Sequence, residues 1–164
     1  MQLQKTQANQ LTNPTEFRVM VTSLEEKLRQ VPWVLKDRKT KYMCPLKHSF
    51  GDGIYVREIF MPKYTFIISA LHKITHPYFI LSGDVSVMTE GGVVRIKAPY
   101  SGMTQAGTKR ILYMHEDTVW CTVHVTDKKD EDEILKDITS EGYNEYDDYV
   151  SRNVVDVIKE VENL

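Results

Sequence analysis

The sequence contains few cysteines and no long apolar run. Cys44 and Cys121 are the only cysteines among its 164 residues, and they stand in no Cys-x-x-Cys spacing. A zinc ribbon or a dithiol redox pair is therefore not indicated, and a reduced intracellular protein is expected. No apolar segment reaches the roughly 20 residues that span a bilayer, and no signal-peptide pattern opens the chain. We expect a cytoplasmic protein with no membrane contact.

Motifs of several large enzyme classes are also missing. The sequence has no phosphate-binding loop, no Gly-x-Ser-x-Gly nucleophile turn, no dinucleotide fingerprint and no metalloprotease helix. The net charge is −2, and the basic residues are scattered rather than clustered, so nucleic acid is not an expected partner. Acidic residues gather in residues 127–164, which carry 13 acidic against 5 basic side chains. This acidic tail could contact a protein partner.

The N-terminal third contains one predicted helix. Asn13, Pro14 and Glu16 have the order of a helix start, in which asparagine accepts from a free amide and proline takes the first turn. Apolar residues at helical spacing follow up to about Gln30, so one face must dock on the rest of the protein or on a second subunit. We expect a loose arm over residues 1–12 and a solvent-facing connector between the helix and residue 51.

Short alternating segments with turn residues between them dominate residues 51–126. They predict strands over 54–61, 64–71, 79–81, 84–89, 93–98, 110–114 and 118–125. Glu90, Gly91 and Gly92 separate two of these segments and predict a hairpin. Helices are predicted again over 130–138 and from 146 onward. The chain thus divides into an N-terminal arm, helix and connector (1–50), a β-barrel (51–126) and an acidic helical tail (127–164).

The order of these signals over about residues 51–126 resembles the cupin superfamily. In that family one motif carries two histidines, an acidic residue and a glycine, and a second motif supplies a third histidine. Anchored on Gly83, the first motif places Ala70 and His72 at its histidine positions and His76 at the acidic one. Arg110 stands where the third histidine would be. The resemblance implies an all-β fold, a cupin-like jelly-roll barrel with an N-terminal helix and a C-terminal helical tail. It also implies a homodimer.

The resemblance leaves a divalent metal, Fe, Mn, Ni or Zn, as an open expectation. His72 and His76 would be two ligands, and a third group would have to come from Glu58, His124 or His115. Such a site would make the protein a metal-dependent enzyme of the dioxygenase, isomerase or lyase type. Arg110 argues against it, because a guanidinium repels a divalent cation and instead grips a carboxylate or phosphate.

The hypothesis that we favour from the sequence is binding of a small anionic molecule in the barrel, with little or no catalysis. Arg110 would be the anchoring cation, and His72, His76 and Tyr78 would be polar contacts. The metal-dependent enzyme is one alternative. Another is an accessory or inhibitory interaction protein that uses the barrel as a scaffold and the acidic tail as its contact surface.

Each candidate residue also has a purely structural interpretation. His72 and His76 could satisfy backbone groups at strand ends around the intervening loop. Arg110 could form a salt bridge to Glu58, Glu116 or Asp117. His124 could simply pack beside an aromatic side chain.

Overall fold

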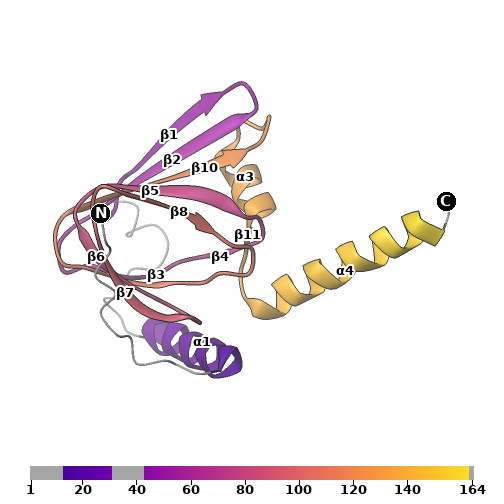
Figure 1. The fold of residues 1–164 in the computed structure, drawn as a ribbon, viewed down its shortest axis with the longest axis horizontal. Helices are drawn as coiled ribbons and strands as arrows, with labels where there is room; N and C mark the ends of the chain where they lie inside the picture. Colours follow the sequence, from indigo (N-terminus) through magenta and orange to yellow (C-terminus); the bar gives the residue numbers. More distant parts are fainter. Residues whose placement is uncertain (1–12, 31–42, 163–164) are drawn as a thin grey trace.

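Two antiparallel sheets face each other and enclose the core of the protein (Figure 1). The computed structural model describes residues 13–30 and 43–162. The larger sheet has the strand order β1 (Leu46–Gly51), β2 (Ile54–Met61), β10 (Thr118–Val125), β5 (His76–Ser82), β8 (Tyr100–Thr104). The smaller sheet has the order β3 (Phe66–Ile68), β9 (Ile111–Met114), β6 (Asp84–Thr89), β7 (Gly92–Lys97). A third, two-stranded pair joins β4 (Leu71–His72) to β11 (Thr139–Ser140).

Helices lie at the two ends of the chain. They are α1 (Pro14–Gln30), α3 (Glu131–Ile138) and α4 (Tyr143–Glu162). Figure 1 shows α1 beside the smaller sheet and α4 extending away from the barrel. The predicted jelly roll with an N-terminal helix and a C-terminal helical tail is confirmed.

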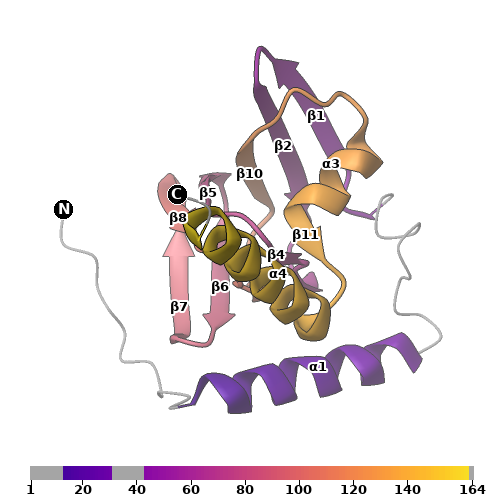
Figure 2. The same cartoon turned by 90° about the vertical axis from the view of Figure 1, so that its right-hand side faces the viewer.

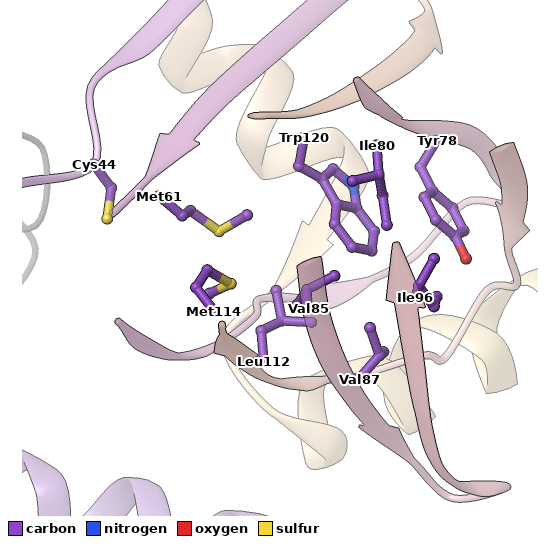
Figure 3. Packing of buried hydrophobic residues seen from close by; sticks show 10 residues of the cluster. All are labelled: Cys44, Met61, Tyr78, Ile80, Val85, Val87, Ile96, Leu112, Met114 and Trp120. Atoms are coloured by element: carbon purple, nitrogen blue, oxygen red, sulfur yellow. The ribbon is translucent and has the colours of Figure 1, made fainter. Parts of the chain in front are cut away.

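The core lies between the inner faces of the two sheets. Trp120 and Ile80 from the larger sheet face Val85 and Leu112 from the smaller one (Figure 3). Alternate residues of each strand point inward, as the period of a β-strand requires. Burial of these side chains is the main favourable contribution to the folding of the barrel.

Helix α1 begins at its predicted cap and covers the outside of the smaller sheet. The side-chain oxygen of Asn13 accepts a hydrogen bond from the backbone amide of Thr15 at 2.9 Å. Phe17 and Val21 are fully buried and pack with Ile111 of β9. The apolar face predicted for this helix is therefore used within the chain.

Glycine fixes two of the tight connections. Thr89 pairs with Gly92 across the predicted hairpin between β6 and β7, and Gly92 has a φ of +104°. Gly83, between β5 and β6, has a φ of +101°. A Cβ atom there would lie 2.3 Å from the hydroxyl oxygen of Thr118, so only glycine fits this crossing.

The structure corrects several predicted strand limits. Residues 46–51, most of which fell in the predicted connector, form β1 and pair residue by residue with β2. The single strand predicted over 64–71 is broken into β3 and β4, and the strand predicted to begin at Phe79 begins at His76. Strands β8 and β11 were not predicted. The arm over residues 1–12 and the connector over 31–42 lie outside the described residues.

The tail returns to the barrel before α4 leaves it. The side chain of Asp130 caps α3 by accepting from the backbone amide of Glu133 at 3.0 Å. Ile134 and Ile138 of α3 are buried against Tyr55 of β2. Figure 2 shows α3 beside the β1–β2 hairpin, which extends beyond the rest of the barrel. Within the described ranges, no helix has the length and apolar character needed to cross a membrane.

Truncation of Phe17 tests the docking of α1. Phe17→Ala removes a fully buried ring and should lower the free energy of unfolding by about 3–5 kcal/mol, measured by urea denaturation. Val19→Ala, on the exposed side of the same helix, is the matched control and should change it by no more than about 0.5 kcal/mol. Equal losses in the two variants would show that α1 is not docked as described.

Candidate functional site

The inner face of the larger sheet changes from apolar to polar along the barrel. The pairing registers align its inward residues in rows across β2, β10, β5 and β8. The first row is apolar and aromatic, and the next is more polar: Ile59, Trp120, Ile80, Tyr100; then Arg57, Thr122, Tyr78, Gly102. Beyond them, Tyr55 pairs with His124 and His76 pairs with Thr104, and the rings of His124 and His76 lie side by side. The candidate site therefore lies at one end of the barrel interior.

Three histidines gather at this polar end. The ring centroids of His72 and His76 are 4.4 Å apart, and those of His76 and His124 are 4.3 Å apart. His72 comes from the short strand β4, so the cluster joins the larger sheet to the β4–β11 pair. His124 also stacks on Tyr55, as the structural interpretation of a histidine beside an aromatic ring expects.

Each histidine has a buried nitrogen that lacks a hydrogen-bond partner among the described residues. His76 donates from Nδ1 to the backbone carbonyl of Ile74 at 2.9 Å, so its Nε2 carries a lone pair with no donor. The Nδ1 atoms of His72 and His124 are likewise unpartnered within those residues. Such orphaned atoms are costly, and native proteins retain them chiefly where water or a ligand completes the set.

The histidines are neutral at physiological pH. Burial, reinforced by the neighbouring His76 and by the positive charge of Arg110, lowers the pKa of His72 to about 3. Burial lowers the pKa of His124 to about 4, and it also lowers the pKa of His76. Neutral imidazoles are the form that accepts hydrogen bonds or binds a metal.

Two arginines supply the positive charge at this end. Arg110 is only 7% exposed and donates to the hydroxyl oxygen of Thr104 at 2.9 Å. Its guanidinium carbon lies 5.1 Å from the centre of the Tyr78 ring and 5.8 Å from that of Trp120. Arg57 leaves its Nε without a partner among the described residues. Burial lowers the pKa of both arginines, although a guanidinium remains charged in proteins.

No carboxylate within the described ranges pairs with either arginine. The salt bridges considered for Arg110, to Glu58, Glu116 or Asp117, are therefore not formed. Glu58 points to the outer face of the sheet and pairs with Lys47 at 2.7 Å. It is thus separated from the histidines that it was expected to join.

A cavity of about 500 Å³ opens on the other side of Arg110. Arg110 and Tyr78 line it, whereas His72, His76 and His124 do not. The expected set of ligand contacts is thus divided, with Arg110 and Tyr78 in the cavity and the histidines behind them. Its walls include aromatic and apolar side chains, namely Tyr100, Val87, Ile96, Met103.

Ion pairs surround the mouth of this cavity. Arg18 of α1 reaches Glu90 in the β6–β7 turn and Asp147 in α4, both at 3.3 Å. Lys109 pairs with Glu25 of α1. Carboxylates of the chain thus neutralise Arg18 and Lys109. Arg110 also lines the cavity, and no carboxylate among the described residues pairs with it.

The sequence predicted a ligand site in the barrel with Arg110 and Tyr78, but it missed Arg57 and most of the residues that line the cavity. Alternation along β2 placed Arg57 on the same face as Tyr55 and Met61, and a single arginine on an otherwise apolar face was an available signal. His115, considered as a third metal ligand, instead lies 2.7 Å from the hydroxyl oxygen of Ser86. Among the described residues, no three histidine, cysteine or acidic side chains are placed to hold a metal ion.

No family model and no curated protein matches the sequence. Solved structures match it in fold. One is a putative ethanolamine utilization protein, EutQ, from Salmonella typhimurium LT2, at 15% identity and a TM-score of 0.43, over 51% of this chain and 69% of that chain. Another is the Cnp3 cupin domain of Schizosaccharomyces pombe, at 16% identity and a TM-score of 0.43, over 50% of this chain and 64% of that chain.

A third match is the DMSP lyase DddQ of Ruegeria pomeroyi DSS-3, at 13% identity and a TM-score of 0.48, over 58% of this chain and 53% of that chain. The chain resembles cupin domains over about half its length. The predicted jelly-roll barrel is borne out by the two facing antiparallel sheets of the structure itself. At such low identities the likeness concerns the fold alone, and the different names of the three proteins select no activity.

The depressed pKa values of the histidines predict a loss of stability in mild acid. The unfolded chain takes up these protons near pH 6.5, whereas folded His72 and His124 resist protonation down to about pH 3 and 4. Stability is therefore full above about pH 6.5 and falls as the pH drops, by about 2 kcal/mol for each of the two histidines between pH 7 and pH 5.

Urea denaturation at these two pH values measures the effect. The His72→Gln, His124→Gln double variant should lose most of this pH dependence, while His115→Gln, outside the cluster, should keep it. An NMR titration in which either buried imidazole protonates near pH 6.5 would contradict the prediction.

Proposed function

We propose that the protein binds a small anionic molecule in the cavity beside Arg110 and does little or no catalysis. One observation carries the proposal. Arg110 is a buried cation with no carboxylate partner among the described residues, and it lines a cavity large enough for a small molecule.

The charge of Arg110 is only partly compensated by the protein. Burial of an unpaired ion is unfavourable. The desolvation penalty is several kcal/mol per ion even after the protein relaxes around it. Cation–π contacts with Tyr78 and Trp120 and a hydrogen bond to Thr104 offset part of this cost. They also restrict the position of the guanidinium, whose planar set of donors suits a carboxylate or a phosphate.

The walls indicate the rest of the ligand. Val87, Ile96 and Met103 offer apolar surface, and Tyr78 and Tyr100 offer aromatic faces. Burial raises the pKa of Tyr78, so its hydroxyl stays neutral and can donate to an anion. The cavity therefore fits an amphipathic anion, with a carboxylate or phosphate at Arg110 and an apolar or aromatic body against these walls.

The histidines act behind this site rather than in it. The positive charge of Arg110 contributes to the low pKa of His72 and of His76. An anion bound at Arg110 reduces that repulsion, so ligand binding should raise both pKa values. The buried imidazoles thus provide an independent readout of binding at Arg110.

Loss of Arg110 should weaken anion binding without unfolding the protein. Inorganic phosphate, benzoate and phenyl phosphate are suitable probes for isothermal titration calorimetry. Arg110→Met should weaken the best probe by about 10–100-fold, the value of a charge-assisted hydrogen bond. Stability should hold, because methionine removes a buried unpaired charge and fills similar volume.

Arg95→Gln is the matched control, because Arg95 is an exposed arginine paired with Asp84 outside the cavity. It should leave the affinity unchanged. Absence of saturable binding for every probe, or an unchanged dissociation constant in Arg110→Met, would refute the proposal. A probe that binds wild type but leaves the NMR signals of His72 and His76 unmoved would place the anion elsewhere.

A metal-dependent enzyme, of the dioxygenase, isomerase or lyase type, is the second candidate. The gathering of His72, His76 and His124 favours it, since three neutral imidazoles suit Zn, Fe, Ni or Mn. Among the described residues, their side chains are not placed to hold a metal ion together, and the positive charges of Arg57 and Arg110 would repel a divalent cation beside them. This candidate therefore has weaker support than anion binding.

Metal content separates the two candidates. Protein purified without chelator should contain far less than one equivalent of Fe, Mn, Ni or Zn by elemental analysis if anion binding is the function. Stoichiometric metal that is lost in His76→Ala but retained in His115→Ala would favour the enzyme and contradict the expectation.

The accessory-protein alternative depends on the acidic tail. Several of its acidic side chains are already engaged, because Glu145 pairs with Lys73, Asp147 pairs with Arg18 and Asp137 pairs with Lys128. Removal of residues 127–164 would also remove Ile134 and Ile138 from the core. The tail therefore supports the barrel, and this alternative has no observation that favours it over anion binding.

A further inference from the structure

The outer face of the smaller sheet presents two rows of side chains that differ in exposure. The pairing registers of β7, β6, β9 and β3 place Val93, Met88, Ile111 and Ile68 in the first row and Arg95, Ser86, Tyr113 and Phe66 in the second. Helix α1 packs on the first row, through contacts with Met88, Ile111 and Ile68 (Figure 1). In the second row, Tyr113 is 38% exposed and Phe66 is 45% exposed. The second row is therefore open to solvent.

This second row contains a serine that is bonded to a histidine. The hydroxyl oxygen of Ser86 lies 2.7 Å from Nε2 of His115. His115 follows β9 directly, and its backbone amide donates to the carbonyl oxygen of Asp84 at 2.8 Å, which holds the residue beside β6. Its ring also meets the ring of Tyr113 edge to face, with 5.0 Å between the centroids. A serine hydroxyl within hydrogen-bond reach of an imidazole has the geometry of a nucleophile and its general base.

A buried carboxylate lies near this pair. Asp84 is 7% exposed and accepts hydrogen bonds from Nε and Nη2 of Arg95, at 2.8 and 3.0 Å. These hydrogen bonds, with smaller contributions from the charges of Arg95 and His115, hold the pKa of the Asp84 carboxyl below its usual range. Asp84 is therefore ionised, and its negative charge stabilises the imidazolium that forms when His115 takes up a proton.

Arg95 supplies a hydrogen-bond donor on the other side of Ser86. The two residues stand directly opposite each other in the register of β6 and β7. The bonds to Asp84 use two of the guanidinium nitrogens, and the third, Nη1, donates to no group among the described residues. This nitrogen is thus available to stabilise a negative charge that develops on an oxygen beside Ser86.

We infer that Ser86 is an activated nucleophile that accepts an acyl group from an activated ester. Its hydroxyl oxygen attacks the carbonyl carbon of the ester, and Nε2 of His115 takes up the hydroxyl proton. The carbonyl oxygen becomes negatively charged and is stabilised by Arg95. When the carbonyl re-forms, the bond to the alcohol breaks, and the alcohol leaves with the bonding electrons and the proton from His115.

The products of this step are an ester of Ser86 and the free alcohol, so no further reactant is needed. The exposed rings of Tyr113 and Phe66 offer a surface on which an aromatic ester can pack. The transfer is stoichiometric, because the serine stays acylated. It takes place outside the barrel and does not depend on anion binding at Arg110.

Reaction with p-nitrophenyl acetate in mildly alkaline buffer tests the inference. Wild type should release a stoichiometric burst of p-nitrophenolate, and mass spectrometry of proteolytic peptides should locate the acetyl group on Ser86. Ser86→Ala should abolish the burst. His115→Gln should slow it by about 100-fold, the low end of what a general base contributes. Glutamine can still hydrogen-bond to Ser86 but cannot take up its proton, so a histidine with only a structural role would cause no such loss.

Ser101→Ala is the matched control, because Ser101 is an exposed serine on β8 of the larger sheet. It should leave the burst unchanged, and circular dichroism should show all three variants folded. Acetylation of other residues while Ser86 stays unmodified would overturn the inference. So would a burst that proceeds at the wild-type rate in folded His115→Gln.

Discussion

The unpaired positive charge of Arg110 is the constraint on which the interior of this barrel depends. Its guanidinium lies against Tyr78 and Trp120 and reaches Thr104, so residues of three strands are oriented around one cation. Burial, with a smaller contribution from the positive charge of Arg110, lowers the pKa of His72 and His76 and keeps these imidazoles neutral. Arg110 thus lies at the boundary between the apolar part of the core, which contains Trp120, and the polar end that contains the histidines.

Backbone geometry makes the arrangement possible at one particular glycine. A Cβ atom on Gly102 would lie 2.8 Å from the ring of Tyr78, so the ring occupies the space that any larger residue at this position would need. Tyr78 can therefore lean across β8 toward Tyr100, with their ring centroids 6.1 Å apart. The aromatic wall of the cavity thus depends on a residue that has no side chain itself.

Local sequence patterns predicted the elements with clear periodicity. Strands β2 and β10, the β6–β7 hairpin and helices α1 and α3 all alternate or repeat strongly enough to be read without tertiary information. Strand β1 was missed because Lys47, His48 and Ser49 show no apolar alternation, and its pairing with β2 stabilises it. Strand β4 has two residues and exists only because β11, far along the chain, pairs with it.

The candidate site was predicted in its residue types but not in its arrangement. His72, His76, His124 and Arg110 stood out in the sequence, yet cross-strand register decides which of them share a compartment. Such register depends on pairing between distant segments, so composition and spacing could not reveal that Arg110 divides the cavity from the histidines. Glu58 shows the same limit, because its outward direction follows from the pairing of β2 with its neighbours.

The contacts of Arg18 have a kinetic consequence for the cavity. This one side chain links α1, the β6–β7 turn and α4 at the mouth, and it also stacks on Tyr143 at 4.5 Å. Both of its ion pairs are partly exposed and are therefore screened by dissolved salt, whereas the buried charge of Arg110 is screened much less. Ionic strength would consequently change how fast a molecule enters and leaves far more than how firmly it is held once inside.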